Sequence, residues 1–331
     1  MKPPESLVFA VQSRCAAQVA WLVLLAVALS AGLGALIVLP MLRPAAKQRP
    51  GIAREAIGFA GTIPLAGDFL TTHHSAGRDA MLPGKRGQEA MTGDAFERWI
   101  DLAPIAGGTL LTVPDGAVQP VLKRMRLDSV KGELRFASFG PGAWLEGKAE
   151  AGAKGLPLDS AYPEPTLSVI QMVRFRPEPG GSVSTVQLAN SSSGQQWVDM
   201  RASWDGSFEV FLGPARRPIK VTGAGPAGRF FIVGLTWEAK KLTGKAVLTV
   251  RPEGGGQRKT AEIKYVPPGS LEPLDQVRLG EKTGASSGVL EVLETLVFNR
   301  NLRPEHLRAI EDWLYRHHVG GVPLEANGSV P

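Results

Sequence analysis

The stretch GVLEVLETLVFNRNLRPEHLRAIEDWL, residues 288–314, decides the fold class of this chain. Its first half is rich in aliphatic and β-branched residues and predicts a core strand that ends at Phe298. Its second half opens with Pro304, which suits the first position of a helix, and Glu305, whose charge the helix dipole favours there. We therefore expect a core strand that leads into a helix over residues 304–317, which Gly320 and Gly321 end.

One face of the predicted helix is apolar. Leu307, Ile310 and Leu314 follow one another at spacings of three and four residues, and Trp313 lies beside them. We predict that these four side chains pack the helix onto a β-sheet and that His317, on the same face, is partly buried.

Short strands separated by turns fill the chain from residue 109 onward. In residues 207–212, Phe208, Val210 and Leu212 share one face, as period-two alternation requires. Gly and Pro make up about a fifth of the chain, which argues against a helical bundle. Because no helices intervene, the pattern predicts an all-β sandwich of two antiparallel sheets. The candidate strands are 109–113, 121–127, 133–136, 143–146, 166–175, 184–189, 197–203, 207–212, 230–238, 245–251, 260–265, 276–280 and 289–298.

Several of these segments, in this order and spacing, resemble a known family. They are ELRFASFGPGAWLE (133–146), TLSVIQMVRFRP (166–177), FFIVGLTW (230–237), VRLG (277–280) and the opening stretch itself. Over about residues 128–320 the chain resembles the laminin-G-like branch of the concanavalin A-like lectin/glucanase superfamily. The resemblance implies a jelly-roll that lies outside the cytoplasm and binds glycans or proteins, often with calcium; some members are glycosidases.

A long apolar segment precedes the predicted sandwich. Residues 15–42, CAAQVAWLVLLAVALSAGLGALIVLPML, carry no charge and are long enough to cross a bilayer. We expect a retained transmembrane anchor; a signal peptide cleaved after Ala26-Val27-Ala28 is the alternative. Gly32 and Gly34 form a small-residue patch suited to helix contact. The apolar residues of the anchor are Trp21, Leu22, Leu24, Leu25, Leu29, Leu33, Leu36, Ile37 and Leu39.

The charges that flank the anchor are nearly balanced. The juxtamembrane basic residues after it are Arg43, Lys47, Arg49 and Arg54, which suit anionic lipid headgroups. By the positive-inside rule, these residues slightly favour an orientation with the C-terminal side in the cytoplasm. Long domains, however, cross membranes largely regardless of charge. The domain type that the resemblance implies leads us to expect a single-pass membrane protein with its C-terminal domain extracytoplasmic, which is periplasmic in a bacterium.

The chain therefore divides into five predicted segments. Residues 1–14 form an N-terminal tail and 15–42 the anchor. Residues 43–108, rich in Gly, Pro and Ala, are expected to be a tether that becomes ordered within an assembly. Residues 109–321 form the sandwich, and 322–331 a C-terminal tail.

Composition excludes some classes of function. The formal charge is +6, of which residues 1–60 supply +4, six basic against two acidic residues. The remaining chain is nearly neutral, whereas a nucleic-acid-binding domain has a basic face, so no nucleic-acid partner is expected. The single cysteine, Cys15, excludes an intramolecular disulfide and a Cys-rich zinc site.

No motif for catalysis is apparent, so we expect no enzyme activity. The glycosidases of the superfamily carry carboxylates that alternate along one strand, and the chain has no E-x-D-x-E run. Glu291 and Glu294 are three apart, which in a regular strand places them on opposite faces. A G-x-S-x-G nucleophile motif is also absent.

Cofactor motifs are missing as well. The histidines lack zinc-ligand spacing, so we expect His306, His317 and His318 to be ordinary helix residues, and His73 and His74 to be a solvated loop pair. No D-x-D-x-D-G run supports calcium; ordinary turn chemistry accounts for Asp115-Gly116 and Asp205-Gly206. The other aspartates at strand ends are Asp159 and Asp199. We expect no cofactor.

Two functions remain. The first is a non-catalytic, membrane-anchored interaction module, an accessory or structural subunit whose partners are membrane lipid and other integral membrane proteins. The alternative is a surface lectin that binds polysaccharide through an exposed aromatic platform, for which Trp144, Trp197 and Trp204 are candidates and Trp237 is expected to be buried. A glycoside hydrolase is a remote third.

Overall fold

A computed structural model describes the sandwich region of the chain. The chain divides into two compact units, residues 1–50 and 51–331, and all described residues belong to the second. They are residues 63–64, 70–76, 81–82, 91–103, 110–126, 133–148, 166–213, 215–238, 244–253, 256–265, 274–281 and 288–319. The predicted anchor, its glycine patch and the basic flank lie outside them. Within these ranges no helix has the length and apolar character that a bilayer crossing requires.

Sheet A contains eight strands, with neighbours antiparallel throughout. Its order is β15 (Lys259–Tyr265), β14 (Gly244–Pro252), β13 (Phe230–Glu238), β8 (Thr166–Pro177), β17 (Gly288–Phe298), β6 (Glu133–Phe139) and β5 (Val121–Arg126). The eighth strand, β1 (Leu70–Ser75), also pairs with β17.

Sheet B contains nine strands, again antiparallel between neighbours. Its order is β12 (Arg217–Val221), β11 (Phe208–Leu212), β10 (Gln196–Ser203), β9 (Ser182–Ala189), β16 (Gln276–Gly280), β7 (Trp144–Lys148), β4 (Leu111–Thr112), β3 (Arg98–Trp99) and β2 (Met81–Leu82). One helix, α4 (Pro304–Val319), follows β17.

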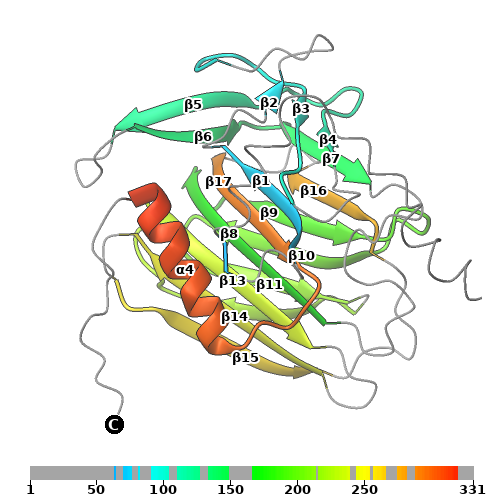
Figure 1. Ribbon diagram of the computed structural model, residues 1–331, viewed down its shortest axis with the longest axis vertical. Coiled ribbons are helices and arrows are strands. Elements are labelled where there is room, and N and C mark those ends of the chain that lie inside the picture. The colour runs from blue at the N-terminus through cyan, green and yellow to red at the C-terminus, as the bar shows by residue number, and fades with distance from the viewer. Residues whose placement is uncertain are drawn as a thin grey trace, which may run out of the picture. The chain divides into compact units, whose positions relative to one another are not determined.

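Two hydrophobic clusters hold these layers together. The first joins the inner faces of the sheets, for example Leu248 of sheet A and Val210 of sheet B. The second lies between the outer face of sheet A and α4, which Figure 1 shows lying along that sheet. Burying one leucine or isoleucine side chain contributes about 1.5–3 kcal/mol. The helix residues of the second cluster are Leu307, Ile310 and Leu314, with Trp313 partly buried against it.

The prediction of two antiparallel sheets with a short C-terminal helix is confirmed. All thirteen candidate strands have a counterpart, and α4 starts at the predicted Pro304. The strand β12 was not predicted. It contains Pro218, which breaks the strand pattern but is tolerated because β12 lies at the edge of sheet B.

The sandwich starts earlier than predicted. Three strands, β1 to β3, come from residues 43–108, which we expected to be tether. Phe96 and Trp99 from this stretch are fully buried in the core between the sheets. Alternation is absent here because β2 and β3 have two residues each and β1 is buried along its whole length.

The expectation that His73 and His74 form a solvated loop pair is wrong. Both lie in β1 and are fully buried. The strand runs antiparallel to β17, with Leu70 opposite Phe298 and Ser75 opposite Glu294. Burial lowers the pKa of His74, whose ring lies against Trp99. These histidines therefore belong to the interior of the domain.

Candidate functional site

The outer face of sheet B carries an array of charged and amide side chains. Except for Arg216, which lies in the turn before β12, each alternates with residues whose side chains point into the core: Arg278 lies between Val277 and Leu279, for example, in β16. Period two therefore places the array on the opposite side of the sheet from the core. We call it the polar face; it consists of Glu146, Gln187, Asp199, Arg201, Arg216 and Arg278.

Asp199 is the centre of one half of the polar face. Its side chain is 1% exposed, and a buried carboxylate is costly unless it is paired and hydrogen-bonded. Its Oδ2 accepts hydrogen bonds from Arg201 Nε at 3.0 Å and Arg216 Nη2 at 2.8 Å. Its Oδ1 accepts one from Ser184 Oγ at 2.7 Å. The acid is thus fully compensated by groups of the same face.

Arg278 is the centre of the other half. Its Nη2 donates to Glu146 Oε2 at 2.6 Å, and its Nη1 donates to Gln187 Oε1 at 2.9 Å. Gln187 in turn donates to Ser184 Oγ at 3.0 Å, which is itself bound to Asp199. One connected network therefore crosses β7, β16, β9 and β10, and such networks hold their members in defined positions.

The guanidinium groups of this face cover its aromatic rings. Arg278 lies over the Trp144 ring at 4.9 Å, and Arg216 lies over the Phe211 ring at 4.7 Å. Trp144 is 7% exposed, whereas the Arg216 side chain is 44% exposed. The face therefore presents arginine, rather than bare aromatic surface, to solvent.

Arg216 also has an unusual backbone. Its φ is +46°, in the left-handed region that an ordinary side chain enters at a cost of about 1–2 kcal/mol. Among the described residues it is the one non-glycine residue with positive φ. Such strain is often found at functional sites, where the surrounding structure holds it in place. Here the strained residue is the most exposed cation bound to Asp199.

A second cluster lies where β1, β17 and the end of α4 meet. Glu294 is fully buried; its Oε2 lies 3.0 Å from His73 Nε2 and its Oε1 lies 3.0 Å from His318 Nε2. Ser75 Oγ donates to the same Oε1 at 2.7 Å. Burial raises the pKa of Glu294, but the charge of His73 and the hydrogen bonds from His318 and His73 outweigh it and lower that pKa to about 2. We call His73, Ser75, Glu294, His317 and His318 the histidine cluster.

The structure corrects the prediction that Glu291 and Glu294 lie on opposite faces of their strand. The register of β17 against β8 shifts between Val292 and Glu294. Such a bulge adds one residue and so cancels the odd spacing. Glu291 pairs with Arg174, which lies against Phe230 of the cluster beneath α4, and Glu294 reaches α4 itself. Both carboxylates therefore face the helix side of sheet A.

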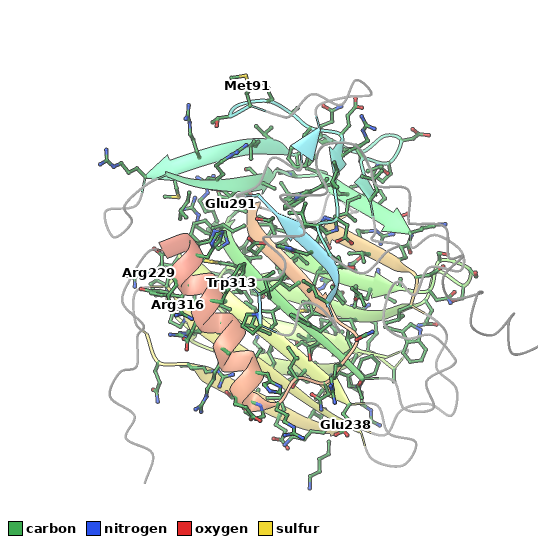
Figure 2. All side chains as sticks on the ribbon, in the orientation of Figure 1. Met91, Arg229, Glu238, Glu291, Trp313 and Arg316 are labelled. Carbon is green, nitrogen blue, oxygen red and sulfur yellow. The ribbon has the colours of Figure 1, made fainter. Side chains whose placement is uncertain are left out.

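Neither of these two acids has a free carboxylate. Glu291 is fully buried and pairs with Arg174 and, at 2.7 Å, with Arg176. Figure 2 labels Glu291 on β17, where it lies opposite Ser138 of β6. A general acid needs access to substrate, and a buried, paired carboxylate lacks it.

The histidines of α4 differ from expectation in their exposure. His318 is buried at 6% exposure, whereas His317, expected to be partly buried, is exposed. The His317 ring stacks on Trp313, with 5.0 Å between ring centroids and 4° between ring planes. Trp313 is labelled on α4 in Figure 2. The end of α4 thus turns one histidine inward and one outward.

The predicted glycan-binding tryptophans separate by exposure. Trp197 is 2% exposed and Trp144 lies under Arg278, while Trp204, at the turn after β10, is 52% exposed. Trp237 is buried at 1% exposure. The three tryptophans predicted as a platform therefore do not share one exposed surface.

The aspartates expected at strand ends take different roles. Asp205 caps its own turn, accepting hydrogen bonds from the backbone and side chain of Ser207. Asp115 lies in the turn that contains Gly116, and Asp159 lies outside the described residues. Asp199 belongs to the polar face. Arg216 and Arg278 were not predicted as site residues, and the period-two alternation around Arg278 is the signal that could have found it.

Comparisons with known proteins place few constraints on this chain. No protein-family model matches it, and no curated protein does. Similar solved structures include the Trypanosoma rangeli sialidase, with a TM-score of 0.47, 15% identity and coverage of 78% of this chain and 34% of that one. They also include the botulinum neurotoxin type G receptor-binding domain, with a TM-score of 0.44, 8% identity and coverage of 75% and 51%. The chain thus spans about a third of the sialidase and about half of the toxin domain.

Proposed function

We propose that this protein is a non-catalytic interaction module that binds another protein through the polar face of sheet B. The observation that carries the proposal is the connected network of three arginines, two acids and a glutamine on that face, with Arg216 and Arg201 reaching solvent. On the opposite outer surface, that of sheet A, α4 packs over the apolar cluster.

The composition of the polar face supports a protein partner. Arginine and aromatic residues are enriched at the centres of protein interfaces, where few residues provide most of the binding energy. The guanidinium groups are already held in position by Asp199 and Glu146, so little side-chain entropy is lost on binding. Charges of both signs alternate on the face, which suits a specific partner better than a polyanion.

The arrangement of the acids supports a role without catalysis. Each acid of the polar face is bound by an arginine, with Arg278 on Glu146 and Arg201 on Asp199. A retaining glycosidase needs one carboxyl group as acid and a second, free one as nucleophile. We therefore propose that the chain is not an enzyme and keep glycoside hydrolysis as a remote alternative.

The membrane part of the proposal rests on sequence. We propose that residues 15–42 anchor the protein as a single helix, with the sandwich on the extracytoplasmic side. Gly32 and Gly34 then offer close contact with other transmembrane helices, so the partners are integral membrane proteins as well as lipid. The laminin-G-like resemblance of residues 128–320 supports an extracytoplasmic recognition domain.

Photo-crosslinking in native membranes tests the partner. A photoreactive residue at Ser203, which follows Arg201 on β10, is combined with either Arg216→Ala or Arg303→Ala. Arg303 is a matched control, because its side chain is 77% exposed and its contact with Glu305 is long, at 4.0 Å. We expect a discrete crosslinked membrane protein that Arg216→Ala reduces at least tenfold and Arg303→Ala does not. A crosslinking pattern unchanged by Arg216→Ala would contradict the proposal.

The lectin alternative has one observation in its favour. Trp204 is exposed at the turn after β10 and offers an apolar surface for a sugar ring. Glycan-array binding by the purified full-length chain, lost on Trp204→Ala and retained on Arg216→Ala, would favour this alternative over a protein partner.

A further inference from the structure

The histidine cluster contains a set of metal-ligand atoms that the proposed function does not use. The ligand atoms of Glu294, His317 and His318 all lie within 4.8 Å of one another. They come from the middle of β17 and the last turn of α4. The five histidines of the chain are all described, and two of them occur in this set.

We propose that Glu294, His317 and His318 bind a divalent transition-metal ion, and that the ion is Zn²⁺. Two imidazole nitrogens and one carboxylate oxygen form a donor set that zinc uses in open sites, where a water molecule takes the fourth position. A site for calcium or magnesium would be built from oxygen atoms instead. No zinc-ligand spacing is visible in the sequence because the third ligand, Glu294, lies on another element.

Two of the three ligand atoms are already at a suitable separation. His318 Nε2 and Glu294 Oε1 are 3.0 Å apart. Two ligands at bond lengths of 2.0–2.1 Å around tetrahedral zinc lie about 3.3 Å from each other. An ion between them takes the place of the proton that the present hydrogen bond shares. The third atom, from the exposed His317, lies within 4.8 Å of the other two and reaches the ion by a rotation of that side chain.

Other residues of the cluster hold the carboxylate in position. His73 Nε2 lies 3.0 Å from Glu294 Oε2, the oxygen that does not face His318. Ser75 Oγ donates to Oε1 at 2.7 Å and leaves that oxygen further acceptor capacity. Metal-binding carboxylates are regularly supported by such hydrogen bonds, and loss of one typically lowers metal affinity 10–100-fold.

The position of His317 provides access from solvent. Glu294 and His318 are buried, so an ion must enter from the side of the exposed ligand. His317 is held there by its stack on Trp313 and lies edge-on to His318 at 4.9 Å. The residues of the cluster therefore come from β1, β17 and α4, and the His317 imidazole is its exposed member.

Thermal unfolding with and without zinc tests the site. The purified full-length chain is treated with a chelator and then titrated with Zn²⁺, with Mg²⁺ as the comparison ion. We expect Zn²⁺ to raise the Tm by about 5–10 °C at a free concentration about 100-fold above its Kd, and Mg²⁺ to leave it unchanged. Co²⁺ in place of Zn²⁺ should produce the visible absorption of a four-coordinate site.

Two histidine variants on the same helix distinguish this site from binding elsewhere. His317→Gln removes an exposed ligand and its stack on Trp313 but leaves the buried contacts of Glu294 intact, so the metal-free Tm should change little. It should weaken zinc binding at least tenfold. His306→Gln, the matched control, should bind zinc as the unaltered chain does. No zinc-induced shift in the unaltered chain would show that the cluster is only a buried ion pair, and an equal shift in His317→Gln would show that zinc binds elsewhere; either result would overturn the proposal.

Discussion

Glu311 of α4 is a buried acid whose protonation depends on its surroundings. Its side chain is 1% exposed; burial raises its pKa, and the nearby Arg258, Arg251 and Thr249 offset this only in part. Arg251 also pairs with Asp312, at 2.6 Å, so it is shared between two acids. The folded state therefore holds the Glu311 proton more tightly than the unfolded state does.

The first prediction follows from the sign of that shift. Between the unfolded pKa, near 4.5, and the raised folded pKa, the folded state binds more protons, so its stability falls as the pH rises. Glu311→Gln should remove this contribution. Urea unfolding at several pH values gives the free energy of unfolding of both chains. The free energy of the unaltered chain minus that of Glu311→Gln should fall as the pH rises above 4.5.

Glu305→Gln provides the control for this titration. Glu305 lies on the same helix with a side chain 63% exposed, so its replacement should leave the pH profile unchanged. Parallel profiles for the unaltered chain and Glu311→Gln would contradict the assignment.

Gly206 lies in a turn that only glycine fits. Its φ is +72°, and a Cβ atom there would lie 2.0 Å from the carbonyl oxygen of Gly225. Gly180 has a similar φ, +82°, but open space around it. We predict that Gly180→Ala costs about 1–2 kcal/mol from backbone strain alone. Gly206→Ala should cost about 1–3 kcal/mol more because the clash is with backbone. Equal losses in thermal unfolding would count against this explanation.

At the scale of single residues, the sequence predicted the burial of apolar side chains better than it predicted the surroundings of charged ones. Leu307, Ile310 and Leu314 follow a helical period that is visible in one dimension, and their burial follows from it. The environment of Glu294 depends on a bulge in β17 and on partners from residues 73–75 and 318, which no local pattern brings together. The polar face likewise depends on the order in which strands pair.

Among the elements, α4 packs on the outer face of sheet A through an apolar cluster. Ile310 is fully buried there, so Ile310→Asp places an unpaired charge in an apolar cluster. We predict a loss of about 4 kcal/mol or more, measured by chemical unfolding. Arg308→Ala, at an exposed position two residues earlier, should change stability by no more than about 0.5 kcal/mol. A small effect of Ile310→Asp would mean that α4 detaches easily.

The strands β1 to β3 provide a test of where the domain begins. A chain that starts at residue 109 lacks these strands and with them Leu70, Phe96 and Trp99, each worth about 1.5–3 kcal/mol when buried. We predict that it unfolds without a sharp transition in circular dichroism, whereas a chain that starts at residue 61 unfolds cooperatively. Equal cooperativity of the two chains would show that the folded domain begins near residue 109, as the sequence predicted.

Whether a strand could be predicted from the sequence depended on its length and on its environment. Strands with one face in the core, such as β11 and β14, show alternation and were predicted closely. β1 is buried throughout, and a strand buried on both sides loses the alternation by which it could be recognised. β2 and β3 are too short to show any period.

For the whole molecule, the proposed anchor makes a direct prediction. Residues 15–42 should keep the full-length protein in the membrane fraction after carbonate extraction, with its original N-terminus retained. Replacing Leu25 and Leu29 with lysine should release it, because each lysine near the centre of a spanning helix costs about 2.5–3.5 kcal/mol. A mature N-terminus near Leu29 would identify the segment as a cleaved signal peptide.

The pairing of β1 with β17 has a consequence for synthesis of the chain. Ser75 and its partner Glu294 are 219 residues apart, so β1 leaves the ribosome long before the strand that completes its hydrogen bonds. At 5–20 residues per second, that interval is roughly 10–45 s. Throughout it β1 has no partner strand for its backbone hydrogen-bonding groups, and such unpaired segments are prone to aggregate. Newly made chains should therefore depend on a holding chaperone until translation has passed β17.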